Sequence, residues 1–139
     1  MLSENVKVSQ IEEGQSAGTS PITSDAVDMA GFEGVLLIGS YGVANSGNYA
    51  KVQQSDDDGV SDGYSDLENT KTTPTVSGNT FMIDIYRPQK RYLKVVETIG
   101  SSSAVGPMLA IQYGPKVLPP THGSTVDDEA HISPDEGTA

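Results

Sequence analysis

Alternating and continuous apolar stretches along the chain predict a series of short β-strands. Residues 6–11 alternate between apolar and polar side chains, which favours an edge strand, whereas residues 35–38 form an apolar run that favours a buried one. Residues 80–86 and 92–98 alternate again, and residues 108–113 supply a last strand. No helical period persists for three turns and no internal repeat is visible, so the pattern predicts a β protein.

Turn signals between these strands refine the prediction to an all-β fold, either a small β-sandwich or a barrel. The Asn45-Ser-Gly-Asn48 turn favours a hairpin between residues 35–38 and 49–54. The five-residue link from Arg87 to Arg91 is short enough for a second hairpin, between residues 80–86 and 92–98. Single helical turns are expected at Asp25–Met29 and near Ser65.

Three regions follow from this pattern. Residues 1–22 are predicted to form an N-terminal arm with an edge strand, and residues 23–113 a β-rich core domain. Residues 114–139 contain four of the eight prolines, are acidic, and have almost no alternation. A segment of this composition does not pack by itself, so we expect an extended acidic C-terminal arm that is disordered in the isolated protein and ordered on its target.

Charge and composition exclude several classes of function. Nineteen acidic residues against eight basic ones give a net charge of −11, which disfavours binding to nucleic acid or to an anionic membrane. The longest apolar runs are four residues, too short to cross a bilayer, and the first residues do not resemble a signal peptide. The absence of cysteine excludes disulfides and thiolate metal sites, and it fits synthesis in a reducing cytoplasm.

The sequence offers no set of residues suited to catalysis. The two histidines, His122 and His131, both fall in the expected C-terminal arm, where a fixed acid–base neighbour is not available. No Gly-x-Ser-x-Gly motif is present, and the Ser101–Ser103 run is typical of a turn. We therefore expect no enzymatic activity, no catalytic residue and no cofactor.

An acidic stretch, residues 56–68, is the one candidate for a metal site. It holds five Asp and one Glu, but neither register of the EF-hand pattern fits. With Gly63 at the sixth position, Val60 and Asn69 occupy ligand positions, and with Gly59 there, Gln54 comes first. We expect a solvated loop that holds no metal, although calcium bound in another geometry would relieve the repulsion between the carboxylates.

Basic and aromatic residues gather on the expected second hairpin. Four of the eight basic residues lie within positions 87–94, interleaved with Tyr86 and Tyr92, and Arg and Tyr are enriched at protein interfaces. The alternative is a solvated turn whose charges pair with the acidic loops. The glycine-flanked Phe32 is a further candidate, with ordinary core packing as its alternative. The protein-contact residues that we predict are Phe32, Tyr86, Arg87, Arg91 and Tyr92.

Three stretches, read in order, resemble small virion proteins of tailed bacteriophages. They are residues 23–34 (TSDAVDMAGFEG), 84–92 (DIYRPQKRY) and 110–116 (AIQYGPK), followed by Thr121-His122 and the SPDEGTA end at 133–139. The family is that of the head decoration, or cement, proteins. The resemblance spans roughly residues 20 to 139, and none of the stretches carries a chemical function of its own.

The resemblance implies a structural role on the virion. Such proteins bind the outer surface of the mature capsid through the major capsid protein, stabilise contacts between capsomers, and commonly cluster as trimers. Two alternatives stay open from the residues alone. One is another virion component, such as a neck, tail or fibre-associated protein, and the other is a non-catalytic carbohydrate- or calcium-binding β module.

Overall fold

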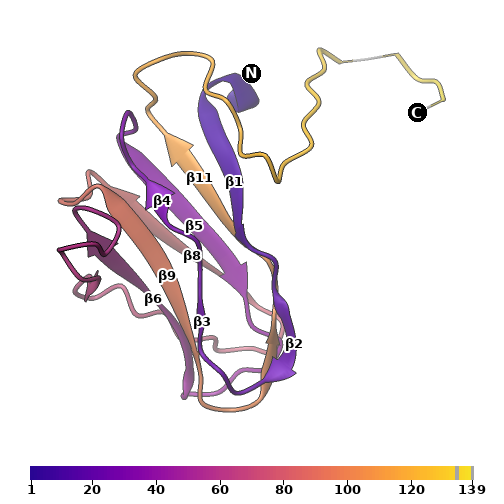
Figure 1. Ribbon diagram of the computed structural model, residues 1–139. Helices are drawn as coiled ribbons and strands as arrows, with labels where there is room; N and C mark the ends of the chain where they lie inside the picture. Colours follow the sequence, from indigo (N-terminus) through magenta and orange to yellow (C-terminus); the bar gives the residue numbers. More distant parts are fainter. Residues whose placement is uncertain (134, 139) are drawn as a thin grey trace.

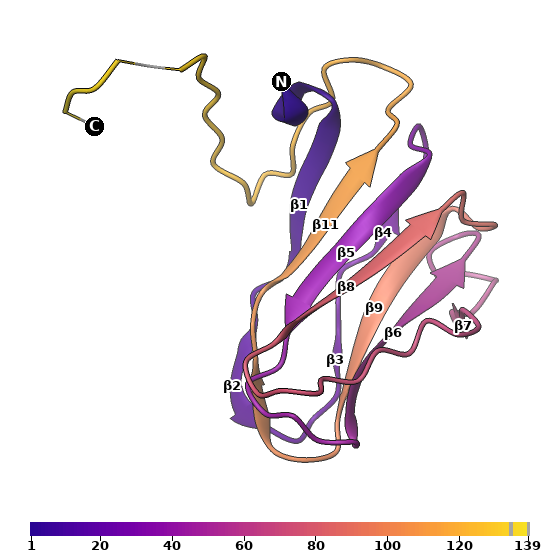
Figure 2. The same ribbon diagram turned by 180° about the vertical axis from the view of Figure 1, so that it is seen from behind.

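Two antiparallel sheets packed face to face account for nearly all the regular structure of the chain (Figures 1 and 2). The computed structural model describes residues 1–133 and 135–138. In chain order its elements are η1 (Leu2–Glu4), β1 (Val6–Glu12), β2 (Gln15–Gly18), β3 (Ile22–Thr23), β4 (Val27–Asp28), β5 (Gly34–Ser40), β6 (Asn48–Ser55), β7 (Ser65–Asp66), β8 (Thr80–Tyr86), β9 (Tyr92–Ile99), β10 (Ser103–Val105) and β11 (Met108–Tyr113).

The strand order confirms the all-β prediction and identifies the fold as a β-sandwich. The sheet that we call sheet A has the order β1-β11-β5-β8, and the facing sheet, sheet C, has the order β3-β9-β6-β7 with β4 also pairing with β9. Strands β2 and β10 form a separate two-stranded sheet. No sheet in the described part of the chain closes on itself, so the fold is a sandwich and not a barrel.

Both predicted hairpins are wrong, because strands that follow one another in sequence lie in different sheets. β5 pairs with β11 and β8 in sheet A, whereas β6 pairs with β9 in sheet C. The link from Arg87 to Arg91 likewise leads from β8 in sheet A to β9 in sheet C. Alternation shows that a segment is a strand with one buried face, but it does not identify the strand's partner.

The two expected helical turns are short strands instead. Val27 and Asp28 form β4, which pairs with Leu93 and Tyr92 of β9. Ser65 and Asp66 form β7, which pairs with the end of β6. In each place a neighbouring strand of sheet C supplies the backbone hydrogen bonds that the local sequence would otherwise satisfy in a turn.

The core lies between the inner faces of the two sheets. Every second residue of β9, β5 and β11, and of β6 as far as Val52, is buried there. The rings of Tyr41 and Phe81 meet in this core with their centroids 6.0 Å apart. The largest fully buried apolar side chains are Tyr41, Leu37, Leu93, Met108, Val35, Val52 and Val95. Burial of an aliphatic side chain of this size contributes about 1.5–3 kcal/mol.

The two ends of the chain meet along one edge of sheet A. The edge strand expected at residues 6–11 is β1, so this part of the expected N-terminal arm belongs to the sandwich, with Val6 and Ile11 buried. The far edge of β1 is covered by the C-terminal segment: Gly123 N donates to Val8 O (2.8 Å) and Val8 N donates to His122 Nδ1 (3.0 Å). No helix among the described residues is long and apolar enough to span a membrane.

Candidate functional site

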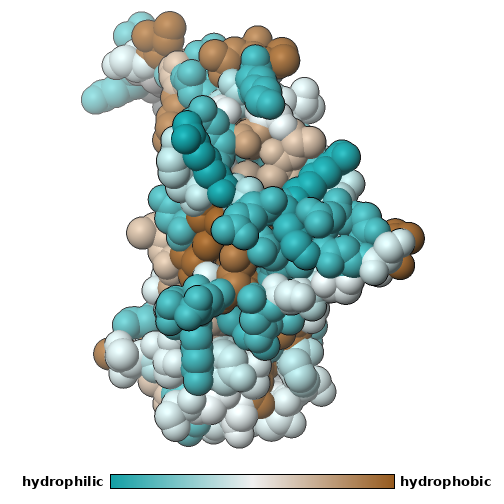
Figure 3. Space-filling view, turned by 90° about the vertical axis from the view of Figure 1, so that its left-hand side faces the viewer, coloured by the Kyte–Doolittle hydropathy of each residue, from teal (hydrophilic) through white to brown (hydrophobic). Residues whose placement is uncertain are grey.

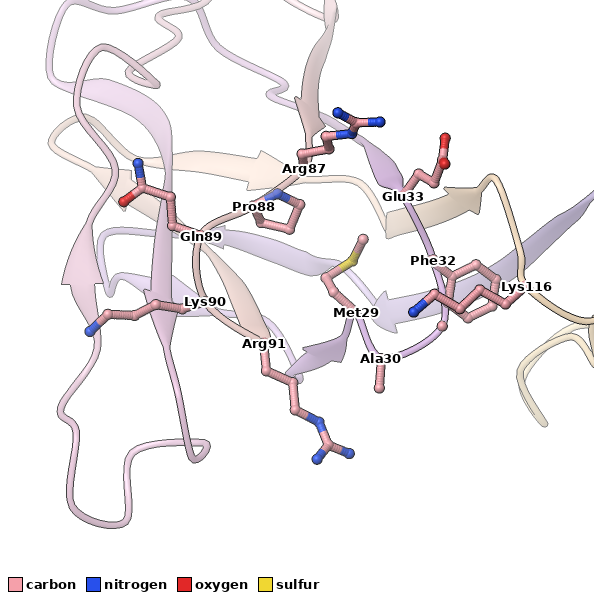
Figure 4. Close-up of a pocket in the computed structure, with 11 residues that line it drawn as sticks. Met29, Ala30, Phe32, Glu33, Arg87, Pro88, Gln89, Lys90, Arg91 and Lys116 are labelled. Atoms are coloured by element: carbon pink, nitrogen blue, oxygen red, sulfur yellow. The ribbon is translucent and has the colours of Figure 1, made fainter.

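An open groove lies at the end of the sandwich where β4 turns into β5, and it is lined by residues 29–33, residues 87–91 and Lys116 (Figure 4). Its volume is about 420 Å³. Backbone hydrogen bonds join the three segments: Met29 N donates to Arg91 O (2.8 Å), Arg87 N to Glu33 O (2.8 Å) and Lys116 N to Gly31 O (2.9 Å). These bonds fix the segments to one another, so the groove is formed without a ligand.

The groove collects basic residues from distant parts of the sequence. A second cavity of about 370 Å³ adjoins the first, shares Phe32 and Lys116 with it, and adds Lys7 from β1. Of the predicted contact residues, Phe32, Arg87 and Arg91 lie here. Five of the eight basic residues of the chain line the two cavities: Lys7, Arg87, Lys90, Arg91 and Lys116.

Two of these cations are already neutralised by the protein. Arg91 donates from Nε and Nη2 to the two carboxylate oxygens of Asp28, both at 2.8 Å, and this bidentate pair lowers the pKa of Asp28. The Nζ of Lys90 lies 2.6 Å from Asp62, whose pKa is lowered chiefly by that hydrogen bond. The Lys90–Asp62 pair fits the alternative in which the charges of the turn pair with the acidic loops, whereas Arg91 pairs with Asp28 of β4.

The remaining three cations have no such partner. Within the described part of the chain, Lys7, Arg87 and Lys116 form no ion pair, and Glu33 is the one carboxylate among the residues that line the two cavities. The Nζ of Lys7 lies 6.0 Å from the centre of the Phe32 ring. The groove therefore combines positive charge, only partly balanced by Glu33 and by the attraction between Lys7 and Asp28, with an apolar ring. This combination suits an anionic segment that carries an apolar side chain.

The two predicted tyrosines lie elsewhere, on opposite sheets. Tyr86 ends β8 on the outer face of sheet A, and Tyr92 begins β9 in sheet C. The guanidinium carbons of Arg87 and Arg91 each lie 5.0 Å from the ring centre of the adjacent tyrosine. The sequence cluster is divided because the link between Tyr86 and Tyr92 crosses from one sheet to the other.

A second candidate surface, the outer face of sheet A, was not foreseen. Residues directly opposite in the antiparallel register share a face, and two rows of the outer face are Val8–Ile111–Leu36–Asp84 and Gln10–Leu109–Ile38–Met82. Met82 is 65% exposed. In Figure 2, where β11, β5 and β8 are drawn in front, no other described segment crosses them.

Aromatic rings extend this apolar face toward the groove. Tyr86 and Tyr113 stack with centroids 6.5 Å apart and an interplanar angle of 6°. The Tyr113 ring lies against Gly34, where any Cβ atom would meet it, so the stack requires glycine at this position. The Tyr113 hydroxyl donates to Asp84 (2.8 Å), which satisfies the one carboxylate in these rows.

The side of the molecule seen in Figure 3 differs in character from the outer face of sheet A. Hydrophilic side chains cover most of the face seen in Figure 3, the side on which β6 and β9 lie in Figure 1, around one hydrophobic patch near its middle. On a protein of net charge −11, the outer face of sheet A is thus unusually poor in charge. The continuous apolar run at residues 35–38 places apolar side chains on both faces of β5, and it is the sequence signal that could have revealed this surface.

The acidic loop is organised by its own hydrogen bonds. The carboxylate of Asp57 accepts from the backbone N–H groups of Val60, Ser61 and Asp62 at 2.8–3.1 Å, and the bond from Asp62 contributes most to lowering the pKa of Asp57. The carboxylate of Asp58 accepts from the Tyr64 hydroxyl (2.6 Å). In the described part of the chain, no three His, Cys, Asp or Glu side chains are grouped so that they could hold a metal ion.

Neither histidine is placed for acid–base chemistry on a substrate. His122 accepts from the backbone of β1, as described above, and His131 lies on the exposed C-terminal segment beside Glu129, 3.0 Å away. The most perturbed carboxyl group is Glu97, which is fully buried between the sheets and lines none of the cavities described here. Burial raises the pKa of Glu97 to about 8.

The fold and these surfaces define an antiparallel β-sandwich with a cationic groove at one end and an apolar outer sheet. No protein-family model matches the chain, and no curated protein matches it. Among solved structures, the SPBc2 prophage-derived protein YomS is similar over 78% of this chain and 92% of its own, with a TM-score of 0.51 and 12% identity.

A chitosan-binding module of a chitosanase/glucanase from Paenibacillus sp. IK-5 is also similar, over 81% of this chain and 96% of its own. Its identity is 19%, and its TM-score of 0.44 is too low to establish a shared fold. The chain therefore shares the β-sandwich architecture of YomS, and at 12% identity that likeness concerns the fold alone.

Proposed function

We propose that this protein is a non-catalytic structural component of a tailed-phage virion, which binds the outer surface of the mature capsid and stabilises contacts between capsomers. Its partners are the major capsid protein and further copies of itself, grouped as trimers. The proposal rests on the sequence resemblance to decoration proteins, and the prophage origin stated for YomS is in keeping with it.

The structural observation that carries the proposal is the outer face of sheet A. A contiguous apolar face on a soluble protein marks an interaction surface, and this one is bounded by the Tyr86–Tyr113 stack. From the strand spacing and rise, four strands of about seven residues cover about 450 Å², roughly half of the ~800 Å² per partner in a stable interface. A single contact of this size is weak, but many copies on one shell add avidity.

A protein that binds only the assembled shell stabilises that shell by mass action, and it needs no bond-making chemistry to do so. The five predicted contact residues lie on different surfaces. Tyr86 belongs to the apolar face, and Phe32, Arg87 and Arg91 to the groove beside it. Tyr92 lies on sheet C, so we expect it to contribute least.

The test uses expanded capsids that lack the protein. They are refilled with wild-type protein or with Met82→Asp, and DNA release on heating is followed by dye fluorescence. We expect wild type to bind and to raise the release temperature. We expect Met82→Asp, at an exposed position of edge strand β8, to bind at least about tenfold more weakly.

Val60→Asp is the matched control, because Val60 is an 84% exposed apolar residue in the acidic loop, away from sheet A. It should behave as wild type. If wild-type protein neither binds the capsids nor delays release, the proposed function is wrong. If wild type binds and Met82→Asp binds equally well, the capsid contact lies elsewhere on the protein.

A further inference from the structure

The last residues of the chain are acidic, and we call residues 126–139 the tail. Thr125 Oγ1 donates to Gln10 O (3.3 Å), and beyond it the described residues run outward from the edge of β1 (Figures 1 and 2). Every described residue after Val126 is exposed. The tail holds five of the nineteen acidic residues and none of the eight basic ones.

The cationic groove described above lies at the same end of the sandwich, and its charge is complementary to that of the tail. Its three cations without an ion-pair partner, Lys7, Arg87 and Lys116, line the two adjoining cavities together with Phe32, and Lys7 Nζ lies 6.0 Å from the centre of the Phe32 ring. The tail has the matching order of groups: acidic residues at 127–129, then Ile132, which is 88% exposed, then acidic residues at 135 and 136. An apolar side chain between two acidic clusters is complementary to a groove that holds an apolar ring together with cations.

We propose that the tail of one copy binds the cationic groove of a second copy. The carboxylates at 127–129 and 135–136 would pair with Lys7, Arg87 and Lys116, and Ile132 would pack against Phe32. A tail on one copy that binds a groove on the next makes a head-to-tail interface, which closes into a ring when the rotation permits. The proposal does not depend on binding to a capsid.

Two observations favour a second copy over the chain's own groove. The tail starts at the outer edge of β1 and runs away from the groove, and His122 and Gly123 are held to β1 on the way. From residue 127 to residue 138 an extended chain covers about 40 Å, enough to reach a neighbouring molecule of this size. The remainder of the protein is acidic, so the groove is the surface where another copy's tail meets least repulsion.

Sedimentation equilibrium of the full chain at low and high salt tests the proposal with charge reversals. The groove variant is Arg87→Glu with Lys116→Glu, and the tail variant reverses three acidic residues, Asp127→Lys, Asp128→Lys and Glu129→Lys. The matched control reverses three exposed acidic residues elsewhere, Glu13→Lys, Asp25→Lys and Glu68→Lys. Circular dichroism confirms that each variant is folded, and Lys116→Glu alone serves if the double variant is not.

We expect wild type to self-associate and to dissociate as salt screens the charges. The groove and tail variants should each associate at least about tenfold more weakly, whereas the control should associate no more weakly than wild type. A mixture of the two variants contains one intact groove and one intact tail, so it should form heterodimers. A chain carrying both sets of reversals should regain association.

Three results would overturn the proposal. They are a wild-type chain that stays monomeric at all concentrations, groove and tail variants that associate as wild type does, and a mixture that forms no heterodimer. Loss of capsid binding with self-association intact would refute the proposed function and leave this inference standing.

Discussion

Replacing Glu97 by Gln should remove a strong pH dependence from the stability of the fold. Glu97 lies on β9 between Ala50 of β6 and Ile22 of β3, and its side chain is fully buried. Among the described residues neither carboxyl oxygen has a hydrogen-bond partner. Burial, with a smaller contribution from the charge of Glu12, raises its pKa from 4.5 to about 8.

The sign and size of the effect follow from that pKa. The folded pKa is above the unfolded one, so the unfolded state loses the proton first as the pH rises. Stability is therefore fully present below pH 4.5 and is lost progressively up to pH 8. At about 1.4 kcal/mol for each pKa unit, the loss for this fully buried group is of the order of 5 kcal/mol. Glutamine does not ionise, so the Glu97→Gln variant should not lose this stability as the pH rises.

Urea unfolding followed by circular dichroism at pH 5 and pH 8 measures this difference. We expect wild type and Glu97→Gln to be nearly equally stable at pH 5, and Glu97→Gln to be several kcal/mol more stable at pH 8. Glu12→Gln is the control, and it should shift the wild-type profile only slightly. A difference between wild type and Glu97→Gln that is the same at both pH values would refute the reasoning.

Three further changes test other features. Gly34→Ala should displace the Tyr113 ring from its stack with Tyr86, because the new Cβ meets the ring; unchanged near-ultraviolet circular dichroism would contradict this. His122→Ala removes the acceptor for the Val8 N–H group of β1 and so loosens the C-terminal segment. Trypsin should therefore cleave after Lys116 several-fold faster than in wild type, and equal rates would argue against this contact. Asp57→Ala leaves three backbone donors unsatisfied, so amide exchange should accelerate in residues 60–62 and stay unchanged in β5.

The class of fold could be predicted because local alternation reports burial on one face. The strands at residues 80–86, 92–98 and 108–113 were predicted within a residue of their ends. The pairing could not be predicted, since the apolar faces of β5 and β6 are buried equally well whether the strands share a sheet or face each other across the core. The same ambiguity concealed β4 and β7, whose hydrogen bonds depend on strands distant in sequence.

The residues of the candidate site could also be predicted from the sequence only in part. The sequence cluster around Arg87 and Arg91 directed attention to the correct end of the sandwich, and glycine-flanked Phe32 lies in the same groove. Lys7 and Lys116 could not be assigned to it, because only the pairing of β1 with β11 brings the two ends of the chain there. Tyr92 was grouped with the others through sequence proximity alone, which the crossing between sheets does not preserve.

That pairing of β1 with β11 also determines when the protein can fold. Val6 lies opposite Tyr113, so β1 has no partner strand in sheet A until β11 has left the ribosome. Contacts between residues so distant in sequence require closure of long loops, and sandwiches of this kind fold in milliseconds to seconds. Sheet A can therefore be completed only after β11 has been made, and residues 122 and 123, which cover the other edge of β1, follow β11 in the sequence.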